Sequence, residues 1–179
     1  MPSLGDIHVL LVDDNKQMRT LLRVMVRAGG VTRISEADNA LDAFDIMRTT
    51  PVNLVLVDWR MRPIDGITFT RMARNDHDAP NPYIPILMVT AHTEVSRVAA
   101  ARDAGVTGFV RKPISSRLLF DRMSNALTDQ RMFIRSDDFF GPDRRHGQHP
   151  DYAGPFRRES DQGRARLDTF DIDEERWRA

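Results

Sequence analysis

Residues 8–14 read HVLLVDD and residues 52–58 read VNLVLVD, and these two stretches decide the fold. Each is an apolar, largely β-branched or leucine-rich run that ends in aspartate. Near-continuous apolar runs of this length are typical of strands buried on both faces, which occur in parallel sheets covered by helices. We therefore expect two buried strands of an α/β sheet that carry carboxylates at their C-terminal ends.

The remaining chain alternates between further apolar runs and helical patterns. Three more strands are predicted, at residues 84–89 and, more weakly, at 32–35 and 108–110. Apolar residues at helical spacing predict five helices, over residues 18–25, 39–48, 67–74, 94–103 and 116–127. This alternation predicts a doubly wound five-stranded parallel sheet with helices on both faces. Ligands of such folds bind at the carboxyl ends of the strands.

Composition excludes several classes of protein. The chain has 179 residues, with 26 basic and 26 acidic side chains and no cysteine. The balanced charge argues against a strongly basic DNA binder, and the missing cysteine excludes disulfides and thiolate zinc sites. No apolar run approaches the roughly 20 residues of a membrane span, and the N-terminus lacks signal-peptide features. We therefore expect a cytoplasmic protein without DNA binding or membrane insertion.

The hydrophobic content changes near residue 130. The segment 131–179 holds seven of the chain's 13 aromatic residues but only four from Ile, Leu, Val and Met: Met132, Ile134, Leu167 and Ile172. So few aliphatic side chains do not build an independent core against the entropy cost of folding. We therefore expect one domain over residues 1–130, followed by an extended or disordered tail over residues 131–179.

The predicted tail contains a short internal repeat. The pattern aromatic-x-Gly-Pro-x-Arg-Arg occurs from Phe139 to Arg145 and again from Tyr152 to Arg158. Gly-Pro favours a turn, and paired arginines bind carboxylates or phosphates. We hypothesise that each copy docks on a surface of its own domain or of a partner. A solvated linker with chance similarity is the alternative.

Aspartates cluster at the predicted strand ends. Asp13 and Asp14 follow the first strand, and Asp58 follows the third. If these strands are neighbours, three carboxylates converge, and a divalent cation would relieve their repulsion. Mg²⁺ takes oxygen ligands of this kind, together with waters and a substrate phosphate. A single aspartate after a strand is also explained as a helix N-cap or turn residue.

Two other strand ends add a hydroxyl and an ammonium group. Thr90 follows the fourth strand, and Lys112 follows the fifth. A carboxylate nucleophile, a cation, a hydroxyl and a lysine are the groups needed to form an aspartyl phosphate. The chain has 24 arginines and only two lysines, Lys16 and Lys112. Because an exposed surface position in this chain would normally hold arginine, the lysine at position 112 indicates a specific role. A compact ammonium suits a crowded phosphate pocket better than a guanidinium does.

The set Asp13-Asp14, Asp58, Thr90-Ala91, Phe109 and Lys112-Pro113 resembles the receiver domain of two-component response regulators, in its single-domain, CheY-like type with a C-terminal tail. The resemblance covers about residues 6–128 and implies the flavodoxin-like strand order 2-1-3-4-5. Residues 58–66, DWRMRPIDG, resemble the family's phosphorylation loop D-x-x-M-P-x-x-D-G. Arg62 is an extra residue in this pattern, and we expect it to change the loop but not the strand end at Asp58.

The resemblance also implies the roles of the acidic residues. Asp58 is the implied phosphoacceptor. Asp13, Asp14 and Asp58 are the implied Mg²⁺ ligands, with the backbone carbonyl of Arg60 as a further ligand. The side chain of Arg60 is a candidate modulator of phosphoryl hydrolysis, because it lies two residues after Asp58. His92, two residues after Thr90, is a second candidate, for which a solvated loop histidine is the favoured alternative.

The remaining positions are implied to form the switch. Thr90 supplies the switch hydroxyl, and Lys112 contacts the phosphoryl group and precedes a cis peptide bond to Pro113. Phe109 occupies the position of the family's aromatic switch residue, often tyrosine; a core aromatic on a short strand is the alternative. The implied readout surface is the fourth helix, fifth strand and fifth helix, which we also regard as a candidate homodimer face. A core-facing helix is the commoner explanation of the wide apolar stripe of residues 116–127.

These features predict a stand-alone response regulator. It accepts a phosphoryl group on Asp58 from a histidine kinase or a histidine phosphotransfer protein, and it acts by binding an unidentified protein or by onward transfer in a phosphorelay. It catalyses only its own phosphorylation and dephosphorylation, so it is not an enzyme with a separate substrate. The main alternative is a phosphorylation-independent scaffold whose tail carries the interaction. An aspartate-based phosphohydrolase lacks its usual second carboxylate, since Arg60 occupies that place, and a nucleic-acid-binding tail is the weakest alternative.

Overall fold

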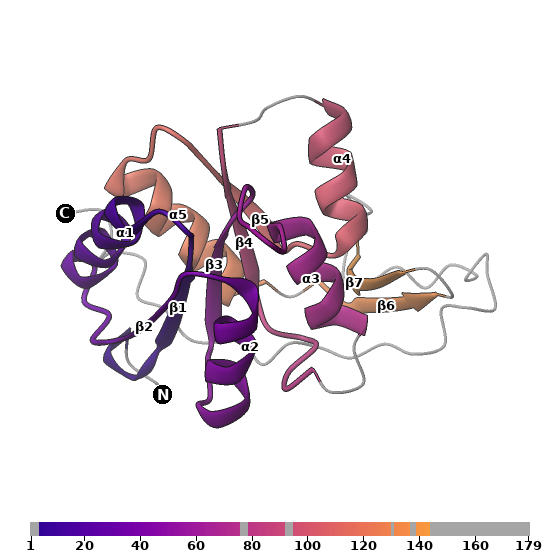
Figure 1. Cartoon of the computed structure of the whole chain (residues 1–179), viewed down its shortest axis with the longest axis horizontal. Coiled ribbons are helices and arrows are strands. Elements are labelled where there is room, and N and C mark those ends of the chain that lie inside the picture. Colours follow the sequence, from indigo (N-terminus) through magenta and orange to yellow (C-terminus); the bar gives the residue numbers. More distant parts are fainter. Residues whose placement is uncertain (1–3, 76–78, 92–94, 130, 137–138, 144–179) are drawn as a thin grey trace.

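Five parallel strands form the centre of the protein (Figure 1). A computed structural model describes residues 4–75, 79–91, 95–129, 131–136 and 139–143. The strands are β1 (His8–Val12), β2 (Arg33–Ala37), β3 (Leu54–Asp58), β4 (Ile86–Thr90) and β5 (Gly108–Arg111). Their order is β2-β1-β3-β4-β5, which confirms the predicted topology. Every residue of β1, β3 and β4 is buried, as expected for apolar runs of this kind.

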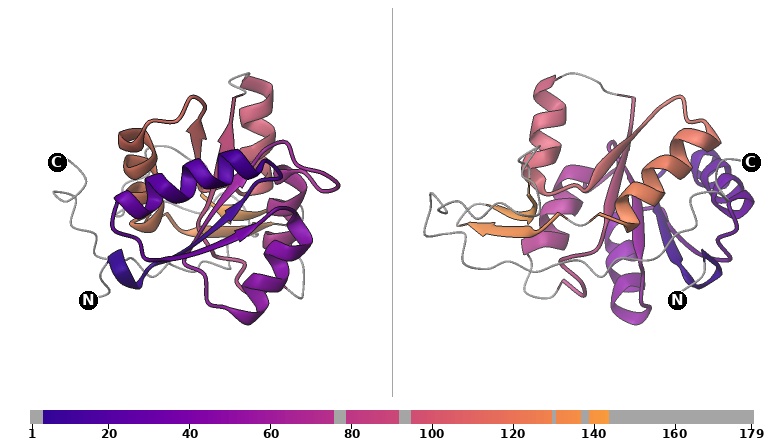
Figure 2. Two further views of the ribbon diagram at one scale, coloured as in Figure 1. Left: turned by 60° about the vertical axis from the view of Figure 1, so that its left-hand side comes forward. Right: turned by 180° about the vertical axis from the view of Figure 1, so that it is seen from behind.

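Helices cover both faces of the sheet (Figure 2). They are α1 (Lys16–Ala28), α2 (Ala40–Thr49), α3 (Gly66–Asn75), α4 (Val95–Ala104) and α5 (Ser116–Leu127), and a 3-10 turn (Leu4–Asp6) precedes β1. Apolar residues of α1 and α5 pack with alternate strand residues such as Leu11 and Leu56. Those of α2, α3 and α4 pack with the other set, such as Leu10 and Val55. The alternation of side chains along a strand thus divides the core into two layers.

The helix boundaries follow local capping. The Asn15 side chain accepts hydrogen bonds from the backbone of Gln17 and Met18, so α1 begins at Lys16. Asn39 accepts from the backbone of Asp42 and precedes α2 in the same way. All five predicted helices and all five predicted strands occur, with ends that differ from the periodic patterns by a few residues at most of the boundaries.

A β-hairpin packs beside α3 and α4, after the fifth helix (Figure 1). Its strands β6 (Phe133–Ser136) and β7 (Phe139–Pro142) pair antiparallel. Phe133 is 0% exposed and Phe140 is 3% exposed, and both rings lie against Tyr83, with centroids 5.2 Å apart in each case. The hairpin is therefore packed onto the domain through its aromatic side chains.

A buried arginine anchors this hairpin. Arg74 of α3 donates hydrogen bonds to the carbonyl oxygens of Gly105 and Pro82, at 3.0 and 2.8 Å, and its guanidinium lies 5.2 Å from the centroid of the Phe133 ring. Burial lowers the pKa of Arg74 to about 9. Gly105 has a φ of +96°, and a Cβ there would lie 2.7 Å from the backbone oxygen of Phe140. Glycine is therefore required where the end of α4 meets the hairpin.

These contacts correct the expected boundary at residue 130. Residues 131–136 and 139–143 belong to the folded domain, because Phe133 and Phe140 supply the buried surface that the scarcity of aliphatic residues had seemed to exclude. The first half of the first Gly-Pro repeat forms β7 and docks on its own domain, as the docking hypothesis allowed. The second repeat, from Tyr152 to Arg158, lies outside the described residues.

Candidate functional site

Asp58 lies at the carboxyl end of β3, between β1 and β4 in the sheet, and is 7% exposed. The Nζ atom of Lys112 lies 2.6 Å from Asp58 Oδ1. The other carboxylate oxygen, Oδ2, accepts a hydrogen bond of 2.7 Å from the backbone N–H of Arg60. One charge-assisted bond and one backbone bond thus hold the Asp58 carboxylate in place.

Asp13 lies beside this pair at the end of β1 and is 1% exposed. Its Oδ1 accepts a hydrogen bond of 2.8 Å from the backbone of Asn15, and its Oδ2 lies 3.8 Å from Lys112 Nζ. This Oδ2 atom is buried and has no hydrogen-bond partner in the described part of the chain. Burial raises the pKa of Asp13, and the nearby charges of Asp58 and Asp14 raise it further, whereas the Asn15 backbone and Lys112 oppose the shift.

The carboxylates fit the donor chemistry of Mg²⁺ as a pair. Across the ranges that the structure describes, no group of three or more histidine, aspartate or glutamate side chains is close enough to hold a metal ion. Asp14 is exposed, whereas Asp13 and Asp58 lie on either side of the Lys112 ammonium. Mg²⁺ usually takes one or two carboxylates and fills its remaining positions with water and phosphate oxygens. The buried Oδ2 atom of Asp13, which accepts no hydrogen bond in the described part of the chain, is an available ligand for such an ion.

Thr90 and Lys112 reach this edge from neighbouring strands. Thr90 ends β4, is 3% exposed and pairs in register with Arg111 of β5. Its carbonyl oxygen accepts a hydrogen bond of 2.8 Å from the backbone of Lys112, which ties the two loops together. The peptide bond between Lys112 and Pro113 is cis. The sheet therefore brings together the hydroxyl, the ammonium and two of the three carboxylates singled out from the sequence.

The loop after Asp58, where β3 ends, contains the extra residue Arg62. Trp59 and Met61 are buried, whereas Arg60 and Arg62 are exposed. A hydrogen bond of 3.0 Å from the Gly66 backbone to the carbonyl of Trp59 closes the loop. A Cβ at Gly66 would collide with the backbone oxygen of Asp58, so only glycine fits at this position.

Phe109 is half-buried on β5 and packs against the core layer formed with α2, α3 and α4. This position is compatible with the core alternative, and a switch role for Phe109 stays a prediction. His92 lies outside the described residues. The homodimer face was expected on α4, β5 and α5. Among the described residues, however, the exposed large hydrophobic side chains are Leu21, Val24 and Leu41, which lie on α1 and α2.

Arg19 belongs to the site but was not anticipated from the sequence. Its Nη1 atom donates a hydrogen bond of 2.6 Å to the backbone carbonyl of Asp13, and its Nε atom lies 3.5 Å from a carboxylate oxygen of Glu36 on β2. Arg23, one turn along α1, also pairs with Glu36 but makes no contact with Asp13 among those described. The only local signal was the position of Arg19 on the first turn of α1, which does not distinguish it from a solvated arginine.

Comparison with known proteins identifies the family. The pattern of the response regulator receiver domain matches residues 9–124. The chemotaxis protein CheY of Pseudomonas aeruginosa is 31% identical over 117 residues, which are 65% of this chain and 93% of that protein. The chain therefore belongs to the response regulator receiver domain family. Members of this family are phosphoacceptor signalling domains rather than classical enzymes.

Solved structures show the same fold. The chemotaxis protein CheY4 of Vibrio cholerae has a TM-score of 0.62 at 22% identity, covering 68% of this chain and 98% of that one. The receiver domain of the sensor histidine kinase PA1611 of Pseudomonas aeruginosa has a TM-score of 0.59 at 24% identity, covering 66% and 95%, and that structure has a magnesium ion coordinated in its active site cleft. In the described part of this chain, no helix is long and apolar enough to cross a membrane.

Proposed function

We propose that this chain is a response regulator that accepts a phosphoryl group on Asp58 in the presence of Mg²⁺. The observation that carries the proposal is the contact of 2.6 Å between Lys112 and Asp58, with Asp13 and Thr90 at the same edge of the sheet. A buried carboxylate paired with a single ammonium, beside a hydroxyl donor, is suited to hold three phosphoryl oxygens.

The transfer follows from the positions of the side chains. A carboxylate oxygen of Asp58 attacks the phosphorus of a phosphohistidine donor. The new P–O bond forms as the P–N bond breaks, and the electron pair of the P–N bond returns to the imidazole nitrogen. The ammonium of Lys112 then compensates charge on the phosphoryl oxygens rather than on Asp58 Oδ1. The hydroxyl of Thr90 donates a hydrogen bond to one of these oxygens, which draws the loops after β4 and β5 together.

Asp13 and Asp58 would hold the Mg²⁺ ion, with Asp14 and the backbone carbonyl of Arg60 as the further ligands that the family resemblance suggests. The bound ion would supply positive charge to the phosphoryl oxygens during transfer. The buried Asp13 Oδ2 atom, which accepts no hydrogen bond in the described part of the chain, supports this assignment. The exposed side chain of Arg60 would flank the phosphoryl group and alter access of the hydrolytic water, as a modulator.

A histidine kinase or a histidine phosphotransfer protein is the proposed donor, because receiver domains interact with both. We propose that output occurs in the cytoplasm through protein contacts of α4, β5 and α5, or by onward transfer in a phosphorelay, and without DNA binding. A homodimer through the same surface is a further prediction. Light scattering of the chain with and without beryllofluoride tests it: an unchanged monomer mass at high protein concentration would contradict it.

Intact-mass spectrometry after incubation with acetyl phosphate and Mg²⁺ tests the phosphoacceptor. We expect one added phosphoryl group on the wild-type chain and none on the Asp58→Asn variant or in EDTA. Asp65→Asn is the matched control: Asp65 lies in the same loop, but its side chain accepts a hydrogen bond from the backbone of Thr68, and its carbonyl accepts one from the backbone of Phe69, both in α3. This control should keep the adduct.

The alternative scaffold function predicts a different result. If the folded wild-type chain gains no phosphoryl group, and beryllofluoride with Mg²⁺ leaves the fluorescence of Trp59 unchanged, the phosphorylation proposal is wrong. A scaffold that acts through the segment after residue 143 would then be the better explanation.

A further inference from the structure

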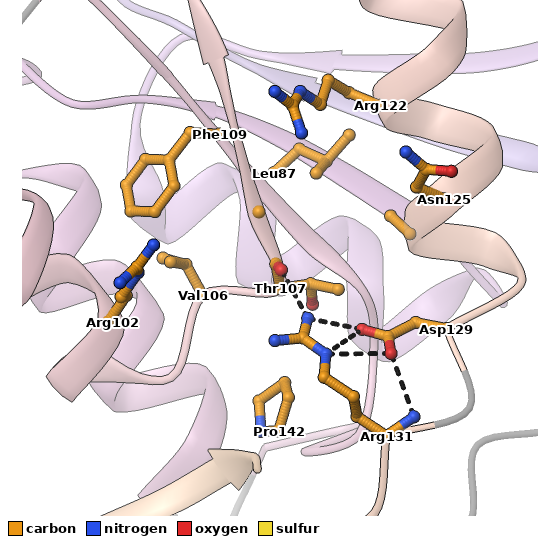
Figure 3. Close-up of a pocket in the computed structure, with 12 residues that line it drawn as sticks. Leu87, Arg102, Val106, Thr107, Phe109, Arg122, Asn125, Asp129, Arg131 and Pro142 are labelled. Atoms are coloured by element: carbon orange, nitrogen blue, oxygen red, sulfur yellow. Dashed lines mark hydrogen bonds and ion pairs between the residues drawn. The ribbon is translucent and has the colours of Figure 1, made fainter. Parts of the chain in front are cut away.

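A pocket of about 410 Å³ lies along the free edge of β5, between α4 and α5 (Figure 3). Its lining includes the apolar residues Leu87, Val106 and Phe109, with Pro142 of β7, alongside polar residues such as Thr107 and Asn125. β5 pairs only with β4 in the five-stranded sheet, so one edge of the strand faces this space without a neighbouring strand. The pocket therefore combines apolar surface with an unpaired strand edge.

Positive charge surrounds the pocket. Arg102 of α4 and Arg122 of α5 line it from two different helices, and both residues are exposed. Within the part of the chain that the structure describes, neither side chain makes an ion pair or a hydrogen bond. Arg131, by contrast, pairs with Asp129 and donates a hydrogen bond of 2.6 Å to the carbonyl of Thr107. Two uncompensated guanidinium groups thus flank a lining that is partly apolar.

The hairpin region builds one end of this pocket. Asp129, Arg131 and Pro142 all line it, and all three lie beyond residues 9–124, where the family pattern matches. The dashed contacts in Figure 3 show Arg131 held between Asp129 and Thr107. This end of the pocket therefore belongs to the extension of this chain and not to the part shared with the family.

We propose that the pocket binds the acidic segment 167–175 of the same chain, which reads LDTFDIDEE. This segment, which lies outside the described residues, contains five acidic residues, no basic residue and three apolar side chains, Leu167, Phe170 and Ile172. Its carboxylates match the two partnerless arginines, and its apolar side chains match the apolar part of the lining, such as Phe109. The opposite charges would attract the segment to the pocket over a distance, and the apolar contacts would remove its apolar side chains from water.

The connection between pocket and segment has a suitable length. Pro142 lines the pocket, so the chain leaves the described domain at the edge of the proposed site. Residues 144–166 then separate it from the segment. A connector of about two dozen residues reaches at most roughly 75 Å when fully extended, which exceeds the dimensions of a pocket of this volume. Tethering at this length gives an effective concentration on the order of millimolar, so a weak contact suffices.

Two-dimensional amide NMR spectra of the full chain test the proposal. The first variant neutralises the segment through Asp168→Asn, Asp171→Asn, Asp173→Asn, Glu174→Gln and Glu175→Gln. We expect it to shift the amide signals of Gly108 and Asn125, which line the pocket, but not that of Val24 on α1. A synthetic peptide of residues 167–175, added to this variant, should return the pocket signals toward their wild-type positions. It should bind the wild-type chain more weakly, because the tethered segment competes.

Charge variants of the pocket then test the arginines. In the neutralised chain, Arg102→Gln or Arg122→Gln should weaken peptide binding about two- to fivefold, which is the range for single exposed ion pairs. Arg117→Gln is the matched control, because Arg117 is exposed on the same helix as Arg122 but does not line the pocket. It should leave the affinity unchanged.

Three results would overturn the assignment. The first is pocket signals that stay in place when the segment is neutralised. The second is equal loss of peptide affinity in the Arg117 and Arg122 variants, which would indicate attraction to overall charge only. The third is a peptide that binds the wild-type and neutralised chains equally well, which would assign the pocket to a segment of another molecule.

Discussion

Replacing Phe133 with alanine should lower the free energy of unfolding of the whole domain by about 3–5 kcal/mol, the usual cost for a fully buried phenylalanine. Phe133 is 0% exposed, and its ring centroid lies 5.2 Å from that of Tyr83 and 5.4 Å from that of Phe140. It also covers the guanidinium of Arg74, which is hydrogen-bonded to the end of α4. Truncation therefore leaves a cavity next to a buried charge, and both effects destabilise the fold.

Urea unfolding followed by Trp59 fluorescence measures this change, because Trp59 is buried next to Asp58, far from the hairpin in sequence. The chain's second tryptophan, Trp177, is replaced by phenylalanine in every sample so that only the domain is observed. Arg135→Ala is the control: Arg135 lies on the same hairpin, is exposed and stacks on the Phe140 ring at 4.3 Å. We expect it to cost less than about 1 kcal/mol.

If the domain were complete without the hairpin, the outcome would differ. In that case Phe133→Ala would release the hairpin and leave the Trp59 transition within about 0.5 kcal/mol of the wild type. Such a result would refute the inference that residues 131–136 and 139–143 belong to the folded unit.

Three further predictions concern single residues. Gly105→Ala should lower the unfolding free energy by about 1–3 kcal/mol in a urea titration, because its φ is +96° and the new Cβ would press on the Phe140 backbone. Asp13→Asn, compared with the wild type in EDTA, should be more stable at pH 7, because burial raises the Asp13 pKa above 3.8 and so penalises the charged form in the folded state. This advantage should diminish as the pH falls through the raised pKa toward 3.8, where both states become protonated. An advantage that persists at low pH would contradict this reasoning. Arg19→Gln should weaken Mg²⁺ binding about tenfold by Trp59 fluorescence, because its bond to the Asp13 carbonyl is lost, whereas Arg23→Gln should not.

The elements and the strand ends were predictable from the sequence. Buried strands are continuous apolar segments, and amphipathic helices have apolar residues with a period of 3.6. Each strand and helix could therefore be identified from its own stretch of sequence. The carboxyl ends of parallel strands meet at one edge, which is why Asp13, Asp58, Thr90 and Lys112 could be grouped before their positions were known. The strand order required the family resemblance, since periodicity does not show which strands are neighbours.

The hairpin was missed because its stability does not come from its own composition. Residues 131–143 contain few aliphatic groups, and a two-stranded hairpin has little stability in isolation. Phe133 and Phe140 become buried only because α3 and the loop before β4 supply Arg74 and Tyr83 as partners. A count of apolar residues within the segment cannot register partners that lie some 50 residues or more away in the chain.

The sequence by itself determined the α/β alternation, the carboxylates at the strand ends and a lysine in an arginine-rich chain, because these depend on residue type and local spacing. The tertiary structure alone decided which groups meet. Lys112 contacts Asp58 across 54 residues, Arg19 reaches the carbonyl of Asp13 from the next helix, and Asp14 turns to solvent while Asp13 is buried. Such contacts depend on how the strands order and how the helices pack, and both result from burial summed over the whole domain rather than from any one segment.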